Sequence, residues 1–432
     1  MNICVLSDKY PPHNAGGAGV IAANLAEAYE TAGHDVTVVT AVENPEDAGH
    51  RQRNGVMVQA SHVRTFNPLR PYYSIYNPFA VSEVATVLDE HSFDVVHAHN
   101  LHQYLSYHSI TLAKRRDIPV VLTVHDAMSV EYGKLVPDPK QIDCSDGAVR
   151  DSLKAGKLSE PAASPYKVDP WEQLKRWKIF YFPLRNRLNR RYLNDRVDVT
   201  VAVSNALKRG LSVNGVYPDS VIHNGTETSG YDGVDAVRFR DAAGLDNERV
   251  VLFSSRPEYY KGGEQLARAF RRVATTQKDV VLAVTGSETA FLERMQELAS
   301  PYDDRVVTTG WVDEGTLRSG YEAASLVVTP SLYLDPFPTV NLEALAAQTP
   351  VIATCFGGSK ELVIDGSTGV ITNPYNIESL TLSINELLNN PERRKRYGEN
   401  GRARVERLFS LEHQVDQYLN LFDQVTDHSD RR

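Results

Sequence analysis

The stretch that decides the fold is Arg249–Val273, which reads RVVLFSSRPEYYKGGEQLARAFRRV. It begins with a short apolar run, Val250–Phe253, typical of a strand that is buried on both faces of a parallel sheet. The loop Ser254–Gly263 separates this run from apolar residues at helical spacing, namely Leu266, Ala269, Phe270 and Val273. A second apolar run, Val280–Val284, completes a strand–helix–strand unit, so the stretch predicts a parallel sheet covered by helices.

The same pattern occurs at the start of the chain. Strands are expected at Ile3–Leu6 and Val36–Thr40, with the loop Asp8–Gly19 and a helix up to Gly33 between them. Further buried strands are expected within 94–98, 119–124, 306–309, 326–329 and 350–353. No repeat of fixed length is present, so the fold class is α/β with two Rossmann-like, doubly wound domains.

The domain boundary is expected in the turn-rich segment around His223-Asn-Gly225. The first domain then covers residues 1–224 and the second 225–408, followed by a C-terminal helix and a frayed tail in 409–432. The first domain contains an irregular, basic insertion at 127–198. Within it we expect a polar loop over Met128–Tyr166 and a helical stretch over Trp171–Arg196, whereas the C-terminal helix is expected to end near Phe422, with fraying from Thr426.

Composition limits the classes of function. The chain has 432 residues and a net charge of −9, which argues against nucleic acid as a partner. The three cysteines, Cys4, Cys144 and Cys355, are far apart and form neither a disulfide framework nor a metal quartet. The N-terminus reads as a buried strand instead of a signal peptide, and no run reaches the roughly 18 apolar residues of a membrane span. These features predict a soluble, cytoplasmic protein.

Two pairs of charged residues lie where the predicted strands of the second domain end. Arg256 and Lys261 stand between a strand and a helix beside two glycines, and two cations at a helix start suit a diphosphate. Asp335 precedes a helix for which Thr339 is the expected N-cap, and Glu343 follows near its first turn. These two carboxylates can accept hydrogen bonds from sugar hydroxyls, or they simply complement the helix dipole.

The first domain offers glycines and histidines at strand ends. Gly16 and Gly17 precede a helix, where missing side chains admit an anion or merely permit a tight turn. His97, His99 and His125 lie at the carboxyl ends of predicted parallel strands, and Asp126 follows His125. In α/β proteins this edge forms the ligand crevice, so His125 is a candidate site residue. His97 and His99 fit a structural role as well as a place in the crevice.

In combination these motifs resemble the retaining glycosyltransferases of family 4, which have the GT-B fold. The resemblance rests on Gly16–Gly19, Thr123-Val-His-Asp126, Val221-Ile-His-Asn-Gly225, Arg256-x4-Lys261-Gly262, Asp335-x7-Glu343 and Gly357-Gly-Ser-Lys-Glu361, and it extends over about residues 1–410. It implies an acceptor-binding N-terminal domain that faces a nucleotide-sugar-binding C-terminal domain across a cleft. It also implies a final helix that crosses back to the first domain.

The resemblance implies roles for individual residues. Arg256 and Lys261 would hold the donor diphosphate, and Glu343 its ribose. Asp335, where the family usually has Glu, would bind hydroxyls of the donor sugar. His125 would line the reaction centre. Gly16 and Gly17 would face the donor phosphates.

The implied reaction moves a hexose-type sugar from a UDP- or GDP-sugar to a glycan or lipid-linked acceptor, with retention at the anomeric carbon. Family members need neither metal nor cofactor, and the sequence has no Asp-x-Asp pair at a strand end. Three alternatives share these motifs: a GT-B sugar-nucleotide epimerase, a sugar phosphorylase and a non-catalytic carbohydrate-binding protein.

The stretch Trp171–Arg196 carries a local charge of +6, because eight basic residues stand against Glu172 and Asp195. Aromatic residues are interleaved, so the segment suits peripheral contact with the anionic inner face of a membrane. The alternative is that its aromatic side chains pack on the domain and that Pro183 interrupts the helix.

Overall fold

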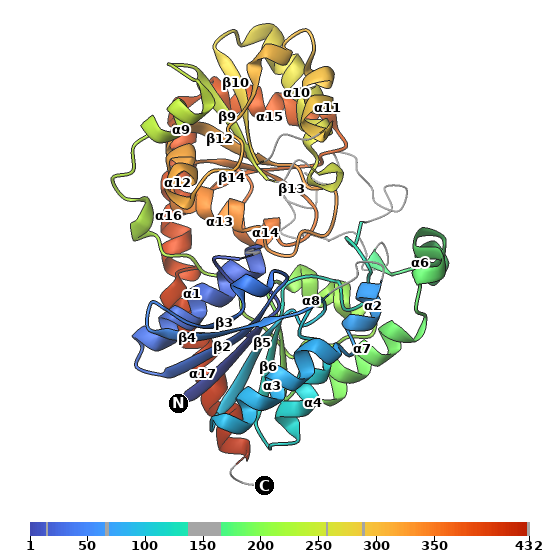
Figure 1. Ribbon diagram of the computed structural model, residues 1–432. Coiled ribbons are helices and arrows are strands. Elements are labelled where there is room, and N and C mark those ends of the chain that lie inside the picture. The colour runs from blue at the N-terminus through green and yellow to red at the C-terminus, as the bar shows by residue number, and fades with distance from the viewer. Residues whose placement is uncertain (14–15, 65–68, 137–165, 256–257, 287–289, 430–432) are drawn as a thin grey trace. The chain divides into compact units, whose positions relative to one another are not determined.

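The structure is a computed structural model that describes residues 1–13, 16–64, 69–136, 166–255, 258–286 and 290–429. Its internal contacts divide the chain into two compact units. Unit 1 contains Met1–Leu135, Lys167–Gly225 and the C-terminal helix α17 (Leu411–Ser429). Unit 2 contains Thr226–Ser410. Each unit is an α/β domain with its own sheet (Figure 1).

The sheet of unit 1 has eight strands in the order β3-β4-β2-β1-β5-β6-β7-β8. All neighbouring strands are parallel except β3 and β4, which form an antiparallel pair. The strands are β1 (Asn2–Ser7), β2 (Asp35–Val42), β3 (Gly49–Arg53), β4 (Val56–His62), β5 (Val95–His99), β6 (Val120–Val124), β7 (Val199–Ala202) and β8 (Ser220–Val221). The central strands β1, β5 and β6 are buried on both faces, which explains why their sequences are largely apolar.

Helices cover the sheet of unit 1. The helices α1 (Gly17–Thr31) and α17 pack together on one face, where Tyr29 of α1 meets Phe422 of α17 with ring centres 5.5 Å apart. In Figure 1, α17 runs beside α1 and carries the end of the chain. The other helices of this unit are α2 (Arg70–Tyr73), α3 (Pro78–Glu90), α4 (His108–Lys114), α6 (Pro170–Trp177), α7 (Leu184–Asp195) and α8 (Asn205–Ser212). The final helix therefore belongs to the first domain, as expected.

The sheet of unit 2 has six parallel strands in the order β11-β10-β9-β12-β13-β14. The strands are β9 (Arg249–Ser254), β10 (Val280–Thr285), β11 (Val306–Thr308), β12 (Ala324–Thr329), β13 (Val351–Thr354) and β14 (Gly369–Thr372). The helices are α9 (Val237–Ala243), α10 (Gly263–Thr276), α11 (Ala290–Ala299), α12 (Glu314–Ala323), α13 (Thr339–Ala346), α14 (Ser359–Leu362), α15 (Ile377–Leu388) and α16 (Pro391–Leu408). One core joins α10, α11 and α15 to the sheet through residues such as Phe270, Met295 and Ile384.

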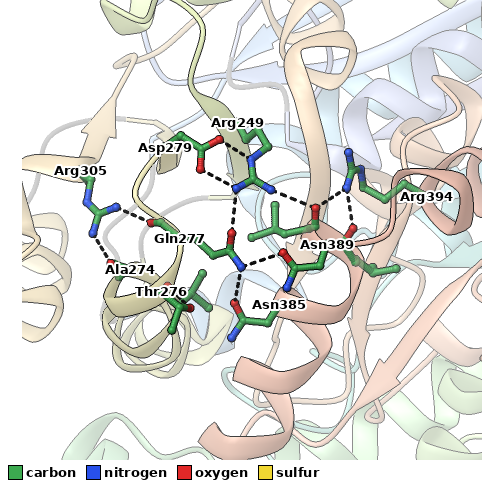
Figure 2. Close-up of polar contacts among 12 residues, drawn as sticks. Arg249, Ala274, Thr276, Gln277, Asp279, Arg305, Asn385, Asn389 and Arg394 are labelled. Atoms are coloured by element: carbon green, nitrogen blue, oxygen red, sulfur yellow. Dashed lines mark hydrogen bonds and ion pairs between the residues drawn. The ribbon is translucent and has the colours of Figure 1, made fainter.

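An arginine network holds the amino end of this sheet (Figure 2). Arg249 at the start of β9 donates two hydrogen bonds to Asp279, at 2.6 and 2.7 Å, and a third to the carbonyl oxygen of Leu388 at the end of α15. Arg394 of α16 donates to the same carbonyl at 2.8 Å. Such bidentate pairs fix geometry. These two arginines are therefore engaged in structure, at the end of β9 opposite the loop that carries Lys261.

Both sheets change direction at one place, and this positions the candidate site. In unit 1 the chain winds outward from β1 through β2 and then from β5 through β6; in unit 2 it does so from β9 and from β12. Ligands of open α/β sheets bind at the carboxyl ends of the strands at such switch points. The loops after β1, β5, β9 and β12 are therefore the candidate ligand-binding loops.

Two local expectations were wrong. The stretch Trp171–Arg196 is not one helix: α6 ends at Trp177, Lys178 has φ +50°, and α7 starts after Pro183, which cannot continue a helix from the preceding turn. The C-terminal helix does not end near Phe422, nor does it fray from Thr426; α17 extends to Ser429. Positions 137–165 of the expected polar loop lie outside the described residues.

Candidate active site

Lys261 lies in the loop after β9 of unit 2. This loop ends in the 3-10 turn η6 (Tyr259–Lys261), and Gly262 then starts α10 from a left-handed backbone with φ +80°. A Cβ at Gly262 would overlap the carbonyl oxygen of Pro330, so only glycine fits where the two loops meet. The Lys261 side chain is 25% exposed. Arg256, the other predicted phosphate ligand, lies outside the described residues.

Asp335 is the hydrogen-bond and ion-pair partner of Lys261. The Lys261 Nζ donates to Asp335 Oδ2 at 3.0 Å, and the Ser331 hydroxyl donates to the same oxygen at 2.9 Å. The Asp335 side chain is 7% exposed. Its backbone is held by the loop after β13, where Gly357 has φ +68° and Gly358 N–H donates to the Asp335 carbonyl at 2.8 Å. A Cβ at Gly357 would overlap the Asp335 backbone, which explains the glycine pair in the Gly357-Gly-Ser-Lys-Glu motif.

The electrostatics of this pair favour the charged form of Lys261. Burial by itself would lower the pKa of Lys261, but the Asp335 carboxylate and the Tyr333 side chain raise it, and the net pKa lies above the usual value for lysine. The Lys261 Nζ also lies 5.1 Å from the centre of the Tyr333 ring, within reach of a cation–π contact. The loop after β9 thus presents a cation that the loop after β12 holds in place at the carboxyl end of the sheet.

Glu343 lies in the second turn of α13. The expectation that Thr339 caps this helix was wrong: Thr339 is its first residue, and Pro338 precedes it without a side-chain cap. The Thr339 side chain instead hydrogen-bonds Glu343, and the Tyr321 hydroxyl donates to Glu343 Oε2 at 2.6 Å. Burial raises the pKa of Glu343, and these two hydrogen bonds partly offset the increase. The carboxylate is thus oriented by groups from α12 and α13.

The predicted histidines of unit 1 lie on β5 and just after β6. His97 and His99 are on β5, where both side chains are completely buried, and His99 is in register with Thr123 of β6. His125 follows β6 and is partly exposed. His99 Nδ1 and His125 Nε2 are 2.9 Å apart, and the two rings stack at 23° with centres 5.2 Å apart. The structure therefore joins two of the three histidines directly.

His97 is held in a buried network of its own. Its Nδ1 hydrogen-bonds the Tyr29 hydroxyl at 3.2 Å, and its Nε2 hydrogen-bonds the Thr123 hydroxyl at 2.9 Å. Thr123 in turn contacts the hydroxyl of Tyr418, from α17, at 2.8 Å. Burial lowers the pKa of His97 to about 3, with a smaller contribution from His125. His97 is therefore a neutral residue that links the sheet to the final helix.

Asp126 supports the turn that carries His125. It accepts hydrogen bonds from Met128 N–H at 2.8 Å and from Asn100 Nδ2 at 3.1 Å, while Asn100 Oδ1 accepts from His125 N–H at 3.0 Å. His102 Nε2 lies 3.7 Å from the same carboxylate. Asp126 thus connects the ends of β5 and β6, which fixes the backbone of His125.

Gly16 and Gly17 begin α1 at the carboxyl end of β1. Gly16 is extended, with φ −101°, and no side chain caps the helix. The first turn contains no acidic residue, so nothing there opposes an approaching anion. Positions 14–15 of this loop lie outside the described residues. In the part of the chain that the structure describes, no group of three or more His, Cys, Asp or Glu residues is arranged to hold a metal ion.

Several residues that make such contacts were not predicted from the sequence. Tyr321 reaches Glu343 from α12, and Tyr418 reaches Thr123 from the far end of the chain. Asp8 accepts three backbone N–H groups, from residues 103 to 105, at 2.7 to 3.0 Å. The position of Asp8, an acidic residue directly after β1, was the sequence feature that could have indicated this role.

Comparison with known proteins decides the family. The model of the glycosyl transferases group 1 matches residues 237–404, and the model of glycosyltransferase family 4 matches residues 15–229. The chain belongs to the family 4 glycosyltransferases. The two matches fall in unit 2 and mainly in unit 1, respectively, so both halves of the glycosyltransferase are represented.

The glycosyltransferase has similar relatives across its length. An uncharacterized glycosyltransferase of Methanocaldococcus jannaschii is 26% identical over 98% of both chains. The alpha-maltose-1-phosphate synthase of Mycolicibacterium smegmatis is 25% identical over 99% of this chain and 100% of its own.

Solved structures show the same fold. The sucrose-phosphate synthase of Thermosynechococcus elongatus superposes with a TM-score of 0.74 at 22% identity and covers 99% of this chain and 100% of its own. The Anabaena protein HepE, solved with UDP-glucose, has a TM-score of 0.69 at 18% identity and covers 98% of this chain and 100% of its own. The fold is therefore GT-B.

Proposed function

We propose that this glycosyltransferase moves a hexose from a UDP- or GDP-sugar to a glycan or lipid-linked acceptor, with retention of anomeric configuration. The observation that supports this most is the Lys261–Asp335 pair, a partly exposed cation and a buried carboxylate at the switch point of unit 2, with Glu343 on the helix that follows. HepE has been solved with UDP-glucose, which favours a uridine donor.

In this proposal the donor binds unit 2. Lys261, with Arg256, holds the diphosphate and stabilises the charge that builds on it as the anomeric bond breaks. Asp335 accepts hydrogen bonds from hydroxyls of the sugar, and Glu343 accepts them from the ribose. Gly16 and Gly17 of unit 1 face the phosphates.

The acceptor proton has no dedicated base in this proposal. The acceptor hydroxyl attacks the anomeric carbon on the face from which the diphosphate leaves, and the departing phosphate oxygen takes the proton. His125 of unit 1 contacts the sugar without taking that proton. No metal and no cofactor take part.

A thermal-shift panel of UDP, GDP, ADP and their sugars tests the donor assignment. UDP or GDP should raise the unfolding temperature, and the Lys261→Ala variant should lose that shift, because a charge-assisted phosphate contact contributes about 1.5 to 3 kcal/mol. Since Lys261 also pairs with Asp335, each variant needs its own nucleotide-free baseline. If Lys261→Ala and Arg256→Ala bind nucleotide as tightly as the wild type, the donor site lies elsewhere. Release of nucleotide only when an acceptor is present would separate a transferase from an epimerase.

The acceptor side of the proposal includes contact with an anionic membrane through α6 and α7. Trp171 is 68% exposed and Leu184 is 53% exposed. A groove of about 800 Å³ along α7 is lined by Leu184, Arg187, Arg190 and Arg191, among others. Neither Arg187 nor Arg190 forms an ion pair with another described residue. None of the described helices is both long and apolar enough to cross a bilayer.

Part of the segment has a structural role instead. Trp177 and Tyr181 pack on Tyr132, each with ring centres 5.6 Å away, so these aromatic residues belong to the domain. The membrane proposal therefore depends on the outward residues alone. Each basic residue close to an anionic leaflet contributes about 1 kcal/mol.

Vesicle co-sedimentation tests this contact. Binding to anionic vesicles at low salt, weakened at high salt and absent with neutral vesicles, is expected. The double variant Arg187→Glu/Arg190→Glu should lose the binding, whereas Arg271→Glu, at an exposed arginine of α10, should keep it. A wild-type protein that stays in the supernatant with anionic vesicles at low salt would rule out the membrane and favour a soluble acceptor.

A further inference from the structure

The contact between His99 and His125 determines which nitrogen of His125 carries a proton. Burial lowers the pKa of both histidines, to about 4 for His125 and well below the usual value for His99, so both rings are neutral near pH 7. A neutral imidazole has one N–H and one bare nitrogen. Because His99 Nδ1 and His125 Nε2 are 2.9 Å apart, one of these two nitrogens donates and the other accepts.

The remaining nitrogen of His99 distinguishes the two arrangements. His99 Nε2 is buried and has no hydrogen-bond partner among the described residues. The His97 ring is close, with centres 4.1 Å apart, but both of its nitrogens are already engaged by Tyr29 and Thr123. His99 Nε2 therefore has no partner among the described residues, whether it carries a proton or a lone pair.

The two arrangements differ in cost. If His125 were the donor, the proton of His99 would stand on Nε2, as a buried N–H with no acceptor. If His99 is the donor, its Nε2 is a bare acceptor. In folded proteins an orphaned buried N–H is rarer than an under-satisfied buried acceptor. The first arrangement is therefore disfavoured, and His99 Nδ1–H donates to His125 Nε2.

We propose that His99 is a positioning residue that keeps the proton of His125 on Nδ1, so that His125 meets the nucleotide-sugar as a hydrogen-bond donor only. This inference rests on the proposed function. His99 is completely buried, whereas His125 is partly exposed, so only His125 reaches a ligand. With Nε2 engaged by His99 and Nδ1 protonated, His125 has no lone pair with which to deprotonate an acceptor hydroxyl.

This assignment gives His125 a defined partner chemistry. A donor N–H suits an oxygen of the sugar, and it excludes the role of general base. The backbone of His125 is held independently through Asn100 and Asp126, so a change at His99 alters the ring more than the main chain.

Nitrogen-15 spectroscopy of the histidine rings in the full chain tests the inference without any substrate. In the ligand-free wild type, the ring of His125, assigned with a His125→Gln variant, should show the Nδ1–H tautomer. The Nε2–H tautomer of His125 would overturn the inference, whether or not the protein binds a nucleotide-sugar. This spectrum is recorded without a nucleotide-sugar or an acceptor substrate, so it remains decisive even if the proposed function is wrong.

Two variants test the consequence for binding. His99→Asn keeps an N–H donor close to the position of Nδ1, and His99→Leu removes it. By calorimetry, the Leu variant should lose about tenfold in affinity for UDP-glucose and keep its affinity for UDP, as expected for one hydrogen bond. The Asn variant should recover most of that loss. Equal affinities of the Asn and Leu variants for UDP-glucose would overturn the positioning role, whereas failure of the wild type to bind UDP would overturn only the donor assignment.

Discussion

Removal of the positive charge of Lys261 should destabilise the free protein before any nucleotide is added. In Lys261→Met the side chain keeps most of its apolar stem, but Asp335 loses its cation. The Asp335 carboxylate is 7% exposed and would keep the hydrogen bond from Ser331 at 2.9 Å. The stranded charge is then only partly compensated.

The magnitude follows from the burial of the two partners. Breaking a buried ion pair by removing one partner costs about 3 to 5 kcal/mol. Lys261 is 25% exposed, and water therefore reaches part of the pair, so we expect the lower end, about 3 kcal/mol. Adding Asp335→Asn removes the stranded charge, so the double variant should recover about 1 to 2 kcal/mol.

Urea unfolding of the wild type, the single variants and the double variant measures this cycle. Lys278→Met, at an exposed lysine of unit 2, serves as the control and should be neutral to within about 0.5 kcal/mol. A cost below about 1 kcal/mol for Lys261→Met, or a double variant no more stable than Lys261→Met, would refute the idea that the pair is charged and buried in the free protein.

Three further predictions concern the rest of the site. The pKa of His97 is about 3 in the folded state and about 6.5 in the unfolded state, so the unfolded chain binds more protons below pH 6.5. The contribution of His97 to the free energy of unfolding should therefore be about 2 kcal/mol lower at pH 5 than at pH 7.5. Urea unfolding at these two pH values should show a weaker pH dependence for a His97→Asn variant than for the wild type. His125→Ala should slow single-turnover transfer at least about tenfold and leave UDP affinity unchanged, because one hydrogen bond to the sugar is lost; an unchanged rate would make His125 structural. Gly357→Ala should lower the free energy of unfolding, measured by thermal unfolding, by at least about 2 kcal/mol, because the added Cβ overlaps the Asp335 backbone. The control Gly366→Ala also has a positive φ but lies in open space, so it should lower this free energy by only about 1 kcal/mol. Equal losses would show that the close approach to Asp335 is unimportant.

The apolar runs of the sequence were sufficient for the fold class. A strand that is buried on both faces is largely apolar, and this pattern is visible residue by residue in segments such as Val280–Val284, which lies within β10. The apolar residues Leu266, Ala269 and Phe270 predicted a helix by their spacing, and they lie on α10, whose periodic apolar face packs on the sheet. The two α/β domains and the GT-B fold are confirmed.

Element ends were predicted less well, because they depend on single turns. Pro183 indicated an interruption, but the actual break extends back to Lys178 with its positive φ. Thr339 suits an N-cap by residue type, yet the helix begins one residue earlier in the chain, and its side chain turns to Glu343 instead. A local preference of about 1 kcal/mol is easily overridden by packing.

The sequence by itself indicated the candidates Lys261, Asp335 and His125 in segments that follow strands, and Glu343 on the helix after Asp335. Only the tertiary structure decided how they pair: Lys261 with Asp335, 74 positions apart, and His99 with His125 across two strands. The physical reason is that periodicity reports the environment of each position one at a time, whereas a pair forms only when sheet order and register bring two loops together. The orphaned nitrogen of His99, on which the assignment of the His125 proton depends, is a property of that packing and leaves no trace in the sequence.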